Sequence, residues 1–201
     1  IFEDRYAVFE RYLTDNWRAF RTWGVSANSP WEHGHFWKLR EGMQRNVLTP
    51  LAVDWENLQR PGFSPDYLRE RYARMDLAYE PSDWVATPAA QALIRNNAPL
   101  LAYIGGAPGQ FTSRDHIFRA GETLEKQIIV INNSRQTVTA ECGWSLELPH
   151  AVSGHTRVKV PTGQQARVPF KIPLPADLPS GAYELRMTVQ FQPGVVQHDA
   201  M

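Results

Sequence analysis

Residues 182–191 read AYELRMTVQF, a stretch in which large apolar side chains alternate with polar ones. Successive side chains of a β-strand point to opposite faces, so the two sets would lie on opposite sides of a sheet. The apolar set is Tyr183, Leu185, Met187, Val189 and Phe191, and the polar set is Glu184, Arg186, Thr188 and Gln190. This alternation predicts a strand of an antiparallel sheet that has one face on a core and one face in water.

The sequence on the N-terminal side of this stretch has the same character back to Pro99. Gly, Pro, Asn and Ser clusters separate further short apolar segments, as expected for turns between strands. The six further candidate strands are Leu100–Ile104, His116–Phe118, Glu125–Asn132, Thr137–Leu146, Thr156–Val160 and Ala166–Ile172. Seven short strands over about 95 residues predict an antiparallel immunoglobulin-like β-sandwich in residues 99–201.

Three details of this predicted sandwich can be specified. We expect Ile129, Trp144 and Tyr183 in its core. Asn132-Asn133-Ser134 contains the acceptor pattern for N-glycosylation, but between two strands it favours a hairpin turn. Cys142 is the single cysteine and lies beside apolar residues, which is typical of a small core side chain.

The N-terminal segment predicts an amphipathic helix of about 20 residues that Gly24 ends. Its apolar residues recur at helical spacing, as Phe2, Tyr6, Phe9, Leu13 and Phe20. Residues 25–29 are small, and after a helix and a Gly they favour a short strand of an αβ unit, whose C-terminal end would face a ligand.

The middle of the chain, residues 41–98, predicts an ordered wrapping segment with short helices. Ser-Pro and Thr-Pro pairs mark helix starts before Asp66–Met75 and Ala89–Asn96. Trp55 and Trp84 indicate that the segment packs against something. The expected organisation is therefore 1–40, 41–98 and 99–201.

Composition excludes several classes of function. Lys and Arg number 21, as do Asp and Glu, so a nucleic-acid partner is not expected. The apolar runs are far shorter than the roughly 20 residues that span a bilayer, so no membrane partner is expected. One cysteine excludes an internal disulfide and a multi-cysteine metal site, and no cofactor is predicted. The chain begins with Ile1, and we interpret its start as an internal cut in a longer polypeptide.

Reactive side chains are densest between residues 28 and 37. Aromatic rings stack on the apolar faces of pyranose rings, and polar side chains bond sugar hydroxyls, so the composition of this loop is typical of a sugar-binding site. The alternative is a packed loop whose tryptophans belong to a core. The candidate substrate-binding residues are Asn28, Trp31, Glu32, His33, His35 and Trp37.

The same loop contains candidate metal ligands and one candidate catalytic carboxylate. His33 and His35 could ligate a metal only with a third ligand from elsewhere, so hydrogen bonding is favoured and no metal is predicted. Glu32 is a weak catalytic candidate because glycosidic cleavage requires two carboxylates, although Asp54 and Glu56 could approach it through the fold.

The segments 17–24 and 25–32 resemble the last helix and strand of the (β/α)8 barrel of retaining glycoside hydrolases in the β-galactosidase-like superfamily. The segments 53–66 and 100–106 resemble bacterial sugar-hydrolase-like proteins in which an immunoglobulin-like domain follows the barrel. The resemblance implies that Trp31 forms the floor of the subsite holding the cleaved sugar. It also implies that the two catalytic glutamates lie before Ile1, in the remainder of the same polypeptide.

The expected fold is therefore a multi-part α+β arrangement: the end of a (β/α)8 barrel, a wrapping segment, and an immunoglobulin-like β-sandwich. The expected function is that of the C-terminal part of a carbohydrate-active enzyme, a retaining glycoside hydrolase, with an oligosaccharide or glycoside as partner. A bacterial periplasmic or secreted location is favoured over the cytoplasm. The alternative is a non-catalytic carbohydrate-binding or protein-interaction β-sandwich module.

Overall fold

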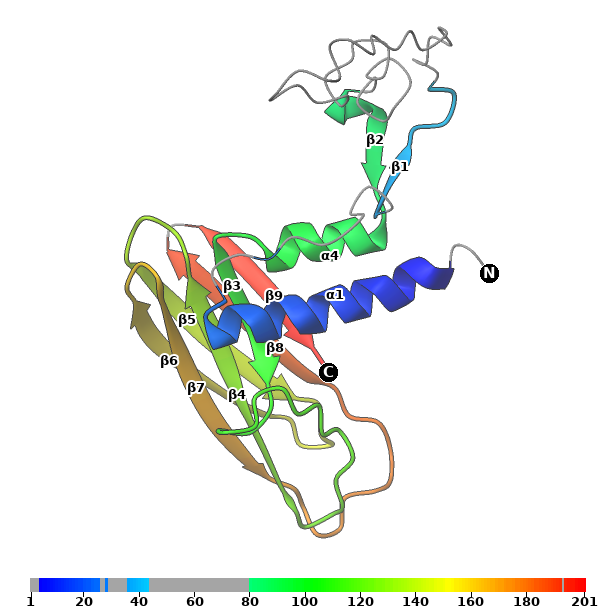
Figure 1. The fold of residues 1–201 in the computed structure, drawn as a ribbon. Coiled ribbons are helices and arrows are strands. Elements are labelled where there is room, and N and C mark those ends of the chain that lie inside the picture. The colour runs from blue at the N-terminus through cyan, green and yellow to red at the C-terminus, as the bar shows by residue number, and fades with distance from the viewer. Residues whose placement is uncertain (1–3, 26–27, 29–35, 44–79, 193) are drawn as a thin grey trace, which may run out of the picture.

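The computed structural model describes residues 4–25, 28, 36–43, 80–192 and 194–201 (Figure 1). The helices are α1 (Asp4–Trp23) and α4 (Pro88–Asn96), with a short 3-10 turn, η4 (Pro81–Asp83), before the second of them. The strands are β1 (Trp37–Leu39), β2 (Trp84–Ala86), β3 (Leu100–Gly105), β4 (Thr123–Asn132), β5 (Val138–Leu146), β6 (Val152–Val160), β7 (Gln164–Pro173), β8 (Leu185–Gln192) and β9 (Val195–Ala200).

Strands β3 to β9 form two antiparallel sheets that pack face to face. One sheet has the order β3-β4-β7 and the other the order β6-β5-β8-β9. The predicted alternation in β8 is confirmed, since its apolar side chains are buried and the polar ones between them are exposed. The core between the sheets includes Ile128, Val130, Ile172, Val189 and Phe191.

The strands differ from the prediction at three points. Residues 116–118 are not a strand, and β9, which the sequence analysis did not identify, closes the second sheet. The turn after Asn132 is not a hairpin, because β4 and β5 belong to different sheets. The Asn132 side chain stabilises this crossing by donating to the carbonyls of Gln136 and Val160, at 2.8 and 2.9 Å.

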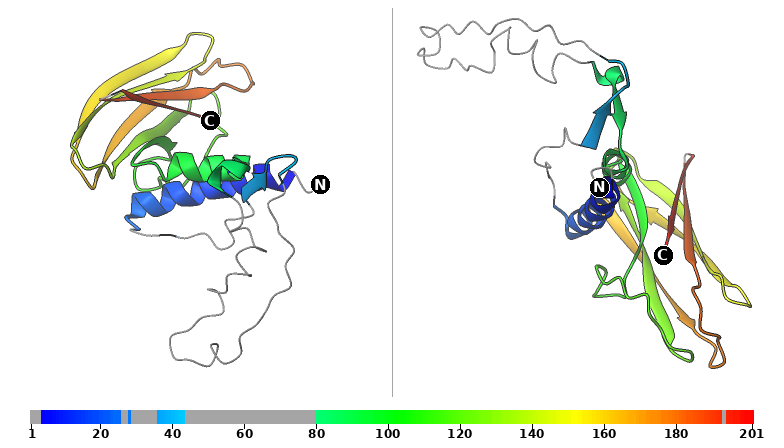
Figure 2. Two further views of the ribbon diagram at one scale, coloured as in Figure 1. Left: turned by 90° about the horizontal axis from the view of Figure 1, so that it is seen from above. Right: turned by 90° about the vertical axis from the view of Figure 1, so that its right-hand side faces the viewer.

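Helix α1 has the predicted length, and it packs beside α4 on one side of the sandwich (Figure 2). Gly24 ends α1 with a φ of 84°, a conformation that glycine adopts without strain. Thr87 caps α4 and Pro88 occupies its first turn, as predicted. The helices share a small apolar core that includes Leu13, Trp17 and Phe36 with three alanines of α4.

The β3-β4-β7 sheet is buried on both faces over part of its area. Leu101, Tyr103, Ile129 and Ile131 point away from the inner core and form a second cluster on the face near α1. The backbone carbonyl of Thr22 in α1 accepts a hydrogen bond from Gln165 at 3.0 Å, which fixes the helix to this sheet. Ile129 was predicted to lie in the core of the sandwich. It is buried instead on the other face of the sheet, the face that α1 covers.

The two aromatic residues predicted for the inner core lie at its margin. Trp144 and Tyr183 are partly buried and pack against it. Trp144 stacks on Phe170 with ring centroids 4.7 Å apart.

The predicted barrel end is wrong. All the strand pairs among the described residues are antiparallel, whereas a (β/α)8 barrel is built from parallel strands. Val25 and Asn28 are not in a strand, and residues 26, 27 and 29 lie outside the described residues. The apolar spacing of α1 was read correctly, but an amphipathic helix covers an antiparallel sheet as readily as a barrel, so the spacing could not distinguish the two folds.

Other expectations fall on residues outside those described. These are the predicted helix Asp66–Met75 and the residues Asp54, Trp55 and Glu56. Among the described residues, no helix is both long and apolar enough to cross a membrane.

Candidate functional site

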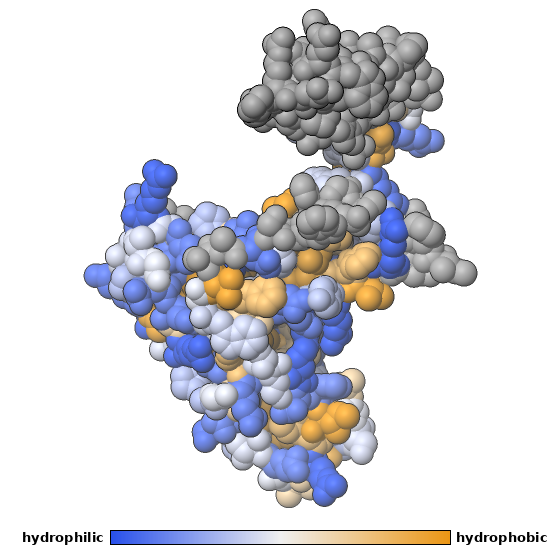
Figure 3. Space-filling view, in the orientation of Figure 1, coloured by the Kyte–Doolittle hydropathy of each residue, from blue (hydrophilic) through white to orange (hydrophobic). Residues whose placement is uncertain are grey.

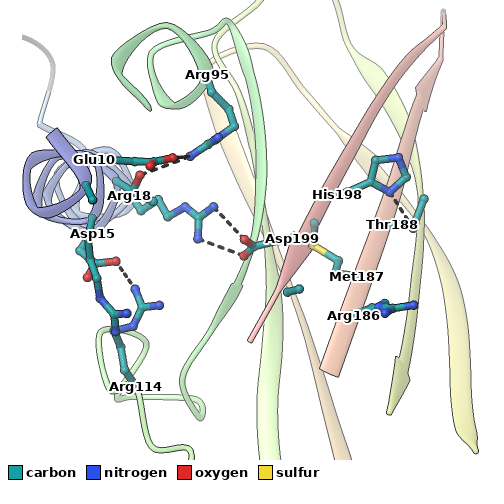
Figure 4. A pocket seen from close by; sticks show the side chains of 14 residues that line it. Glu10, Asp15, Arg18, Arg95, Arg114, Arg186, Met187, Thr188, His198 and Asp199 are labelled. Carbon is teal, nitrogen blue, oxygen red and sulfur yellow. Dashed lines mark hydrogen bonds and ion pairs between the residues drawn. The ribbon is translucent and has the colours of Figure 1, made fainter. Parts of the chain in front are cut away.

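A groove of about 620 Å³ runs between α1 and the strands β8 and β9 (Figure 4). Arginine and carboxylate side chains dominate its lining. The charged residues are Glu10, Arg11, Asp15, Arg18, Arg95, Arg114, Arg186 and Asp199, and Met187, Thr188 and His198 come from the strands. The first helix of the chain and its last two strands therefore both contribute walls of the groove.

Strand β9 positions Asp199 at the centre of the groove. Arg18 of α1 donates two hydrogen bonds to the Asp199 carboxylate, each at 3.0 Å. Asp199 Oδ2 also accepts from the backbone N–H of Ile104 in β3 at 2.9 Å. One carboxylate thus holds α1, β3 and β9 together.

The side chain of Gln197 lies two positions before Asp199 on the same side of β9. It accepts a hydrogen bond from the Ala102 N–H at 2.6 Å and donates one to the Leu100 carbonyl at 2.8 Å. These side-chain bonds occupy the free edge of β3, which would otherwise present unpaired backbone groups. These contacts hold β9, the strand that carries Asp199, against the edge of β3.

Arg18 is itself held by neighbours on three elements. Its Nε donates to Asn96 Oδ1 at 3.1 Å, and its guanidinium lies 5.0 Å from the centre of the Tyr103 ring. The Tyr103 hydroxyl shares a 2.7 Å hydrogen bond with Thr22. Burial raises the pKa of Tyr103, so this hydroxyl stays protonated at neutral pH.

Three of the other arginines of the groove are paired with carboxylates. Arg114 pairs with Asp15 and Arg95 pairs with Glu10, whereas Arg186 bonds Glu184 and Glu147 outside the groove lining. Together with Arg18, four of the five arginines have an acidic partner. The groove therefore offers hydrogen-bond donors beside acceptors, and three of its five arginines are paired with carboxylates of its own lining.

A second hollow of about 310 Å³ continues the groove toward the C-terminal end of α1. It shares Asp15, Arg18, Arg114 and Asp199 with the first. The Trp23 side chain lines it and is 62% exposed. Phe111 supports this indole edge-on, with ring centroids 5.5 Å apart. An exposed aromatic ring thus lies beside a row of polar pairs.

Of the predicted site residues, Asn28 and Trp37 are described. Asn28 is exposed. Trp37 begins β1 and is partly buried against the helix core. Trp31, Glu32, His33 and His35 lie outside the described residues.

Neither a metal centre nor a reactive thiol emerges from the part of the chain that the structure describes. No three His, Cys, Asp or Glu side chains gather there in a way that could hold an ion. Cys142 is buried in the core, where desolvation raises its pKa to about 11.

The sequence analysis missed the residues that form the groove. Arg18 and Asp199 are 181 positions apart, so no local spacing could associate them. Asp199 lies in the strand that was missed. Trp23 was noted only as part of the helix end.

No protein-family model matches the chain, and no curated protein matches its sequence. Solved structures that match part of the chain include the CARDB domain of a Pyrococcus furiosus protein, with 14% identity, coverage of 51% of this chain and 83% of that chain, and a TM-score of 0.39. A FixG-related protein from Vibrio parahaemolyticus has 13% identity, coverage of 51% and 93%, and a TM-score of 0.37. The alkylpurine DNA glycosylase AlkC of Pseudomonas fluorescens has 8% identity, coverage of 57% and 33%, and a TM-score of 0.33, so the match spans a third of that enzyme.

None of these likenesses shows a family for the chain. The resemblance to β-galactosidase-like barrel enzymes is wrong, because the described strands form antiparallel sheets, whereas a (β/α)8 barrel is built from parallel strands.

Proposed function

We propose that the chain is a non-catalytic carbohydrate-binding module whose ligand lies in the groove between α1 and the sandwich. The observation that carries this proposal is the exposed Trp23 ring at one end of a groove lined by arginine–carboxylate pairs. A sugar ring stacks its apolar face on an indole, and its hydroxyls both donate and accept hydrogen bonds.

The pairing of charges favours a neutral polyhydroxyl ligand over an anion. A phosphate or polyanion would require arginines without acidic partners, but Arg18, Arg95 and Arg114 each have one within the groove. The paired carboxylates Asp15 and Asp199 offer acceptor lone pairs beside the arginine donors. This arrangement suits binding, and the engagement of both carboxylates in ion pairs argues against an acid–base role.

The test is binding to an array of neutral oligosaccharides, followed by titration of the best ligand. Trp23→Ala is expected to lower the affinity at least tenfold, because a stacked aromatic contributes about 1 to 3 kcal/mol in comparable sites. Tyr12→Ala is the matched control, since Tyr12 is a similarly exposed aromatic on the same helix and does not line the groove.

A second function, protein interaction, is favoured by the solvent side of α1. Val8 and Tyr12 lie one turn apart there and are both largely exposed, and Figure 3 shows apolar side chains interrupting the hydrophilic surface near the helices. If no neutral glycan binds, or if Tyr12→Ala weakens glycan binding as much as Trp23→Ala, the carbohydrate proposal is wrong. Self-association that Tyr12→Ala abolishes would then support the protein-interaction function.

A further inference from the structure

A lysine occupies an inward position in the sandwich. Lys126 lies between Leu124 and Ile128 on the row of β4 that faces the other sheet, and it is 2% exposed. Alternation requires an apolar side chain there, and a buried charge is costly unless it is compensated. Positions that break a local rule in this way are often functional.

The surroundings of the ammonium group compensate it only in part. Lys126 Nζ donates one hydrogen bond to the backbone carbonyl of Asp115 and lies 5.9 Å from the centre of the Phe118 ring. An ammonium group has three N–H donors. No carboxylate lies within ion-pair distance of it among the described residues. Burial lowers the pKa of Lys126, and the negative charge of Asp115 in the same pocket counters this effect only in part.

A pocket of about 580 Å³ opens beside this lysine at one end of the sandwich. Its walls are mainly leucine, from strands of both sheets and the loops that follow them. They are Leu124, Leu146, Leu148, Leu174, Leu178 and Leu185. This volume is within the range of pockets that hold small organic ligands, about 300 to 1,000 Å³.

We propose that this pocket binds an aliphatic carboxylate, with the hydrocarbon chain among the leucines and the carboxylate on Lys126. The two remaining N–H donors of the ammonium match the two oxygens of a carboxylate, and the apolar walls match an alkyl chain. The site is separate from the groove along α1, since the two share no lining residue.

The test is isothermal titration of the full chain with decanoate and with decan-1-ol, which has the same chain length and no charge. Wild type is expected to bind decanoate at least tenfold more tightly than decan-1-ol. Lys126→Met, which keeps the length and removes the charge, should lower the decanoate affinity at least tenfold and leave that for decan-1-ol unchanged. Lys171→Met is the matched control, because Lys171 is an exposed lysine of the neighbouring strand β7 that pairs with Glu125.

The proposal is overturned if wild type binds decanoate no better than decan-1-ol, or if Lys126→Met binds decanoate as wild type does. Should Lys126→Met fail to fold, Leu178→Glu decides the question. Leu178 is a partly exposed loop residue, so the variant should fold, and it places a negative charge in the apolar wall that holds the alkyl chain of an anionic ligand. Loss of decanoate binding in Leu178→Glu supports the site, and unchanged binding overturns it.

Discussion

Arg18 and Asp199 form a two-pronged ion pair that links the first helix of the chain to its last strand. The side chains are only 12% and 15% exposed, so the pair lies mostly out of water. Asp199 also accepts from the backbone of β3, and Arg18 also donates to Asn96 of α4. The helix pair and the sandwich are thus joined through polar contacts as well as through the apolar cluster beneath α1.

Asp199→Ala is expected to lower the free energy of unfolding by about 3 kcal/mol, because it leaves the Arg18 charge without its partner in a mostly buried position. The measurement is urea unfolding followed by circular dichroism. Glu141→Ala is the control, since Glu141 pairs with Arg157 on the surface and such pairs contribute about 0 to 1 kcal/mol. Equal losses in both variants would show that the Arg18–Asp199 pair has no special role.

A second prediction concerns the cluster beneath α1. A fragment of residues 99–201 lacks the helix and exposes Leu101, Tyr103, Ile129 and Ile131 on one sheet face. We expect this fragment to bind the dye anilinonaphthalene sulfonate and to self-associate, because an apolar patch on a sheet is an aggregation site. Sedimentation velocity measures the oligomeric state of the fragment and of the full chain. A monomeric fragment as stable as the full chain would show that α1 contributes nothing to the sandwich.

The strands of residues 99–201 were largely predictable because alternation is a local signal. Leu185 to Phe191 shows it without interruption. Strand β9 was missed because Val195-Val196-Gln197-His198-Asp199 has no apolar inner row; its inward side chains, Gln197 and Asp199, bond the edge of β3. The sequence also could not show which side chains of β4 face the inner core. Both faces of this strand are covered, and both carry apolar residues.

The barrel assignment failed for a different physical reason. A helix, a glycine and a run of small residues describe a local unit, and such a unit specifies no strand direction. The sheet on which α1 lies is antiparallel, and the bond from Thr22 of α1 to Tyr103 of this sheet spans 81 positions. The groove was missed for the same reason, since its ion pairs join α1 to residues far along the chain, 99 positions away for Asp15–Arg114 and 181 for Arg18–Asp199.

A third prediction concerns Cys142. A thiol with a pKa near 11 has about one thousandth of its molecules as thiolate at pH 8, and the thiolate is the reactive form. We expect no reaction with Ellman's reagent in the native protein at pH 8 and one thiol after unfolding in urea. Rapid modification of the folded protein at pH 8 would contradict the buried position.

The same shift links stability to pH. The folded-state pKa of Cys142 is raised above its ordinary value of 9.0, so the stabilisation is complete below pH 9 and is lost as pH rises toward 11. Between pH 9 and 11 the melting temperature of wild type should fall more steeply than that of Cys142→Ala. Parallel curves would show that the thiol does not ionise differently in the two states.

The last prediction concerns Gly154, which faces Trp144 across the β5–β6 ladder. A Cβ at Gly154 would lie 2.6 Å from the Trp144 ring, and this ring cannot move aside freely because it stacks on Phe170. Gly154→Ala should therefore lower the free energy of unfolding by about 1 to 3 kcal/mol, the usual cost of forcing an extra methyl group into a packed contact. Gly143→Ala is the matched control, because Gly143 neighbours Trp144 on β5 and a Cβ there meets nothing closer than 3.7 Å. In that variant the alanine should be neutral or slightly stabilising, since glycine is unfavourable in a strand.

Urea unfolding measures both variants, and tryptophan fluorescence reports on the ring. If Gly154→Ala is as stable as Gly143→Ala and its fluorescence is unchanged, the Trp144–Phe170 stack does not hold the ring against β6.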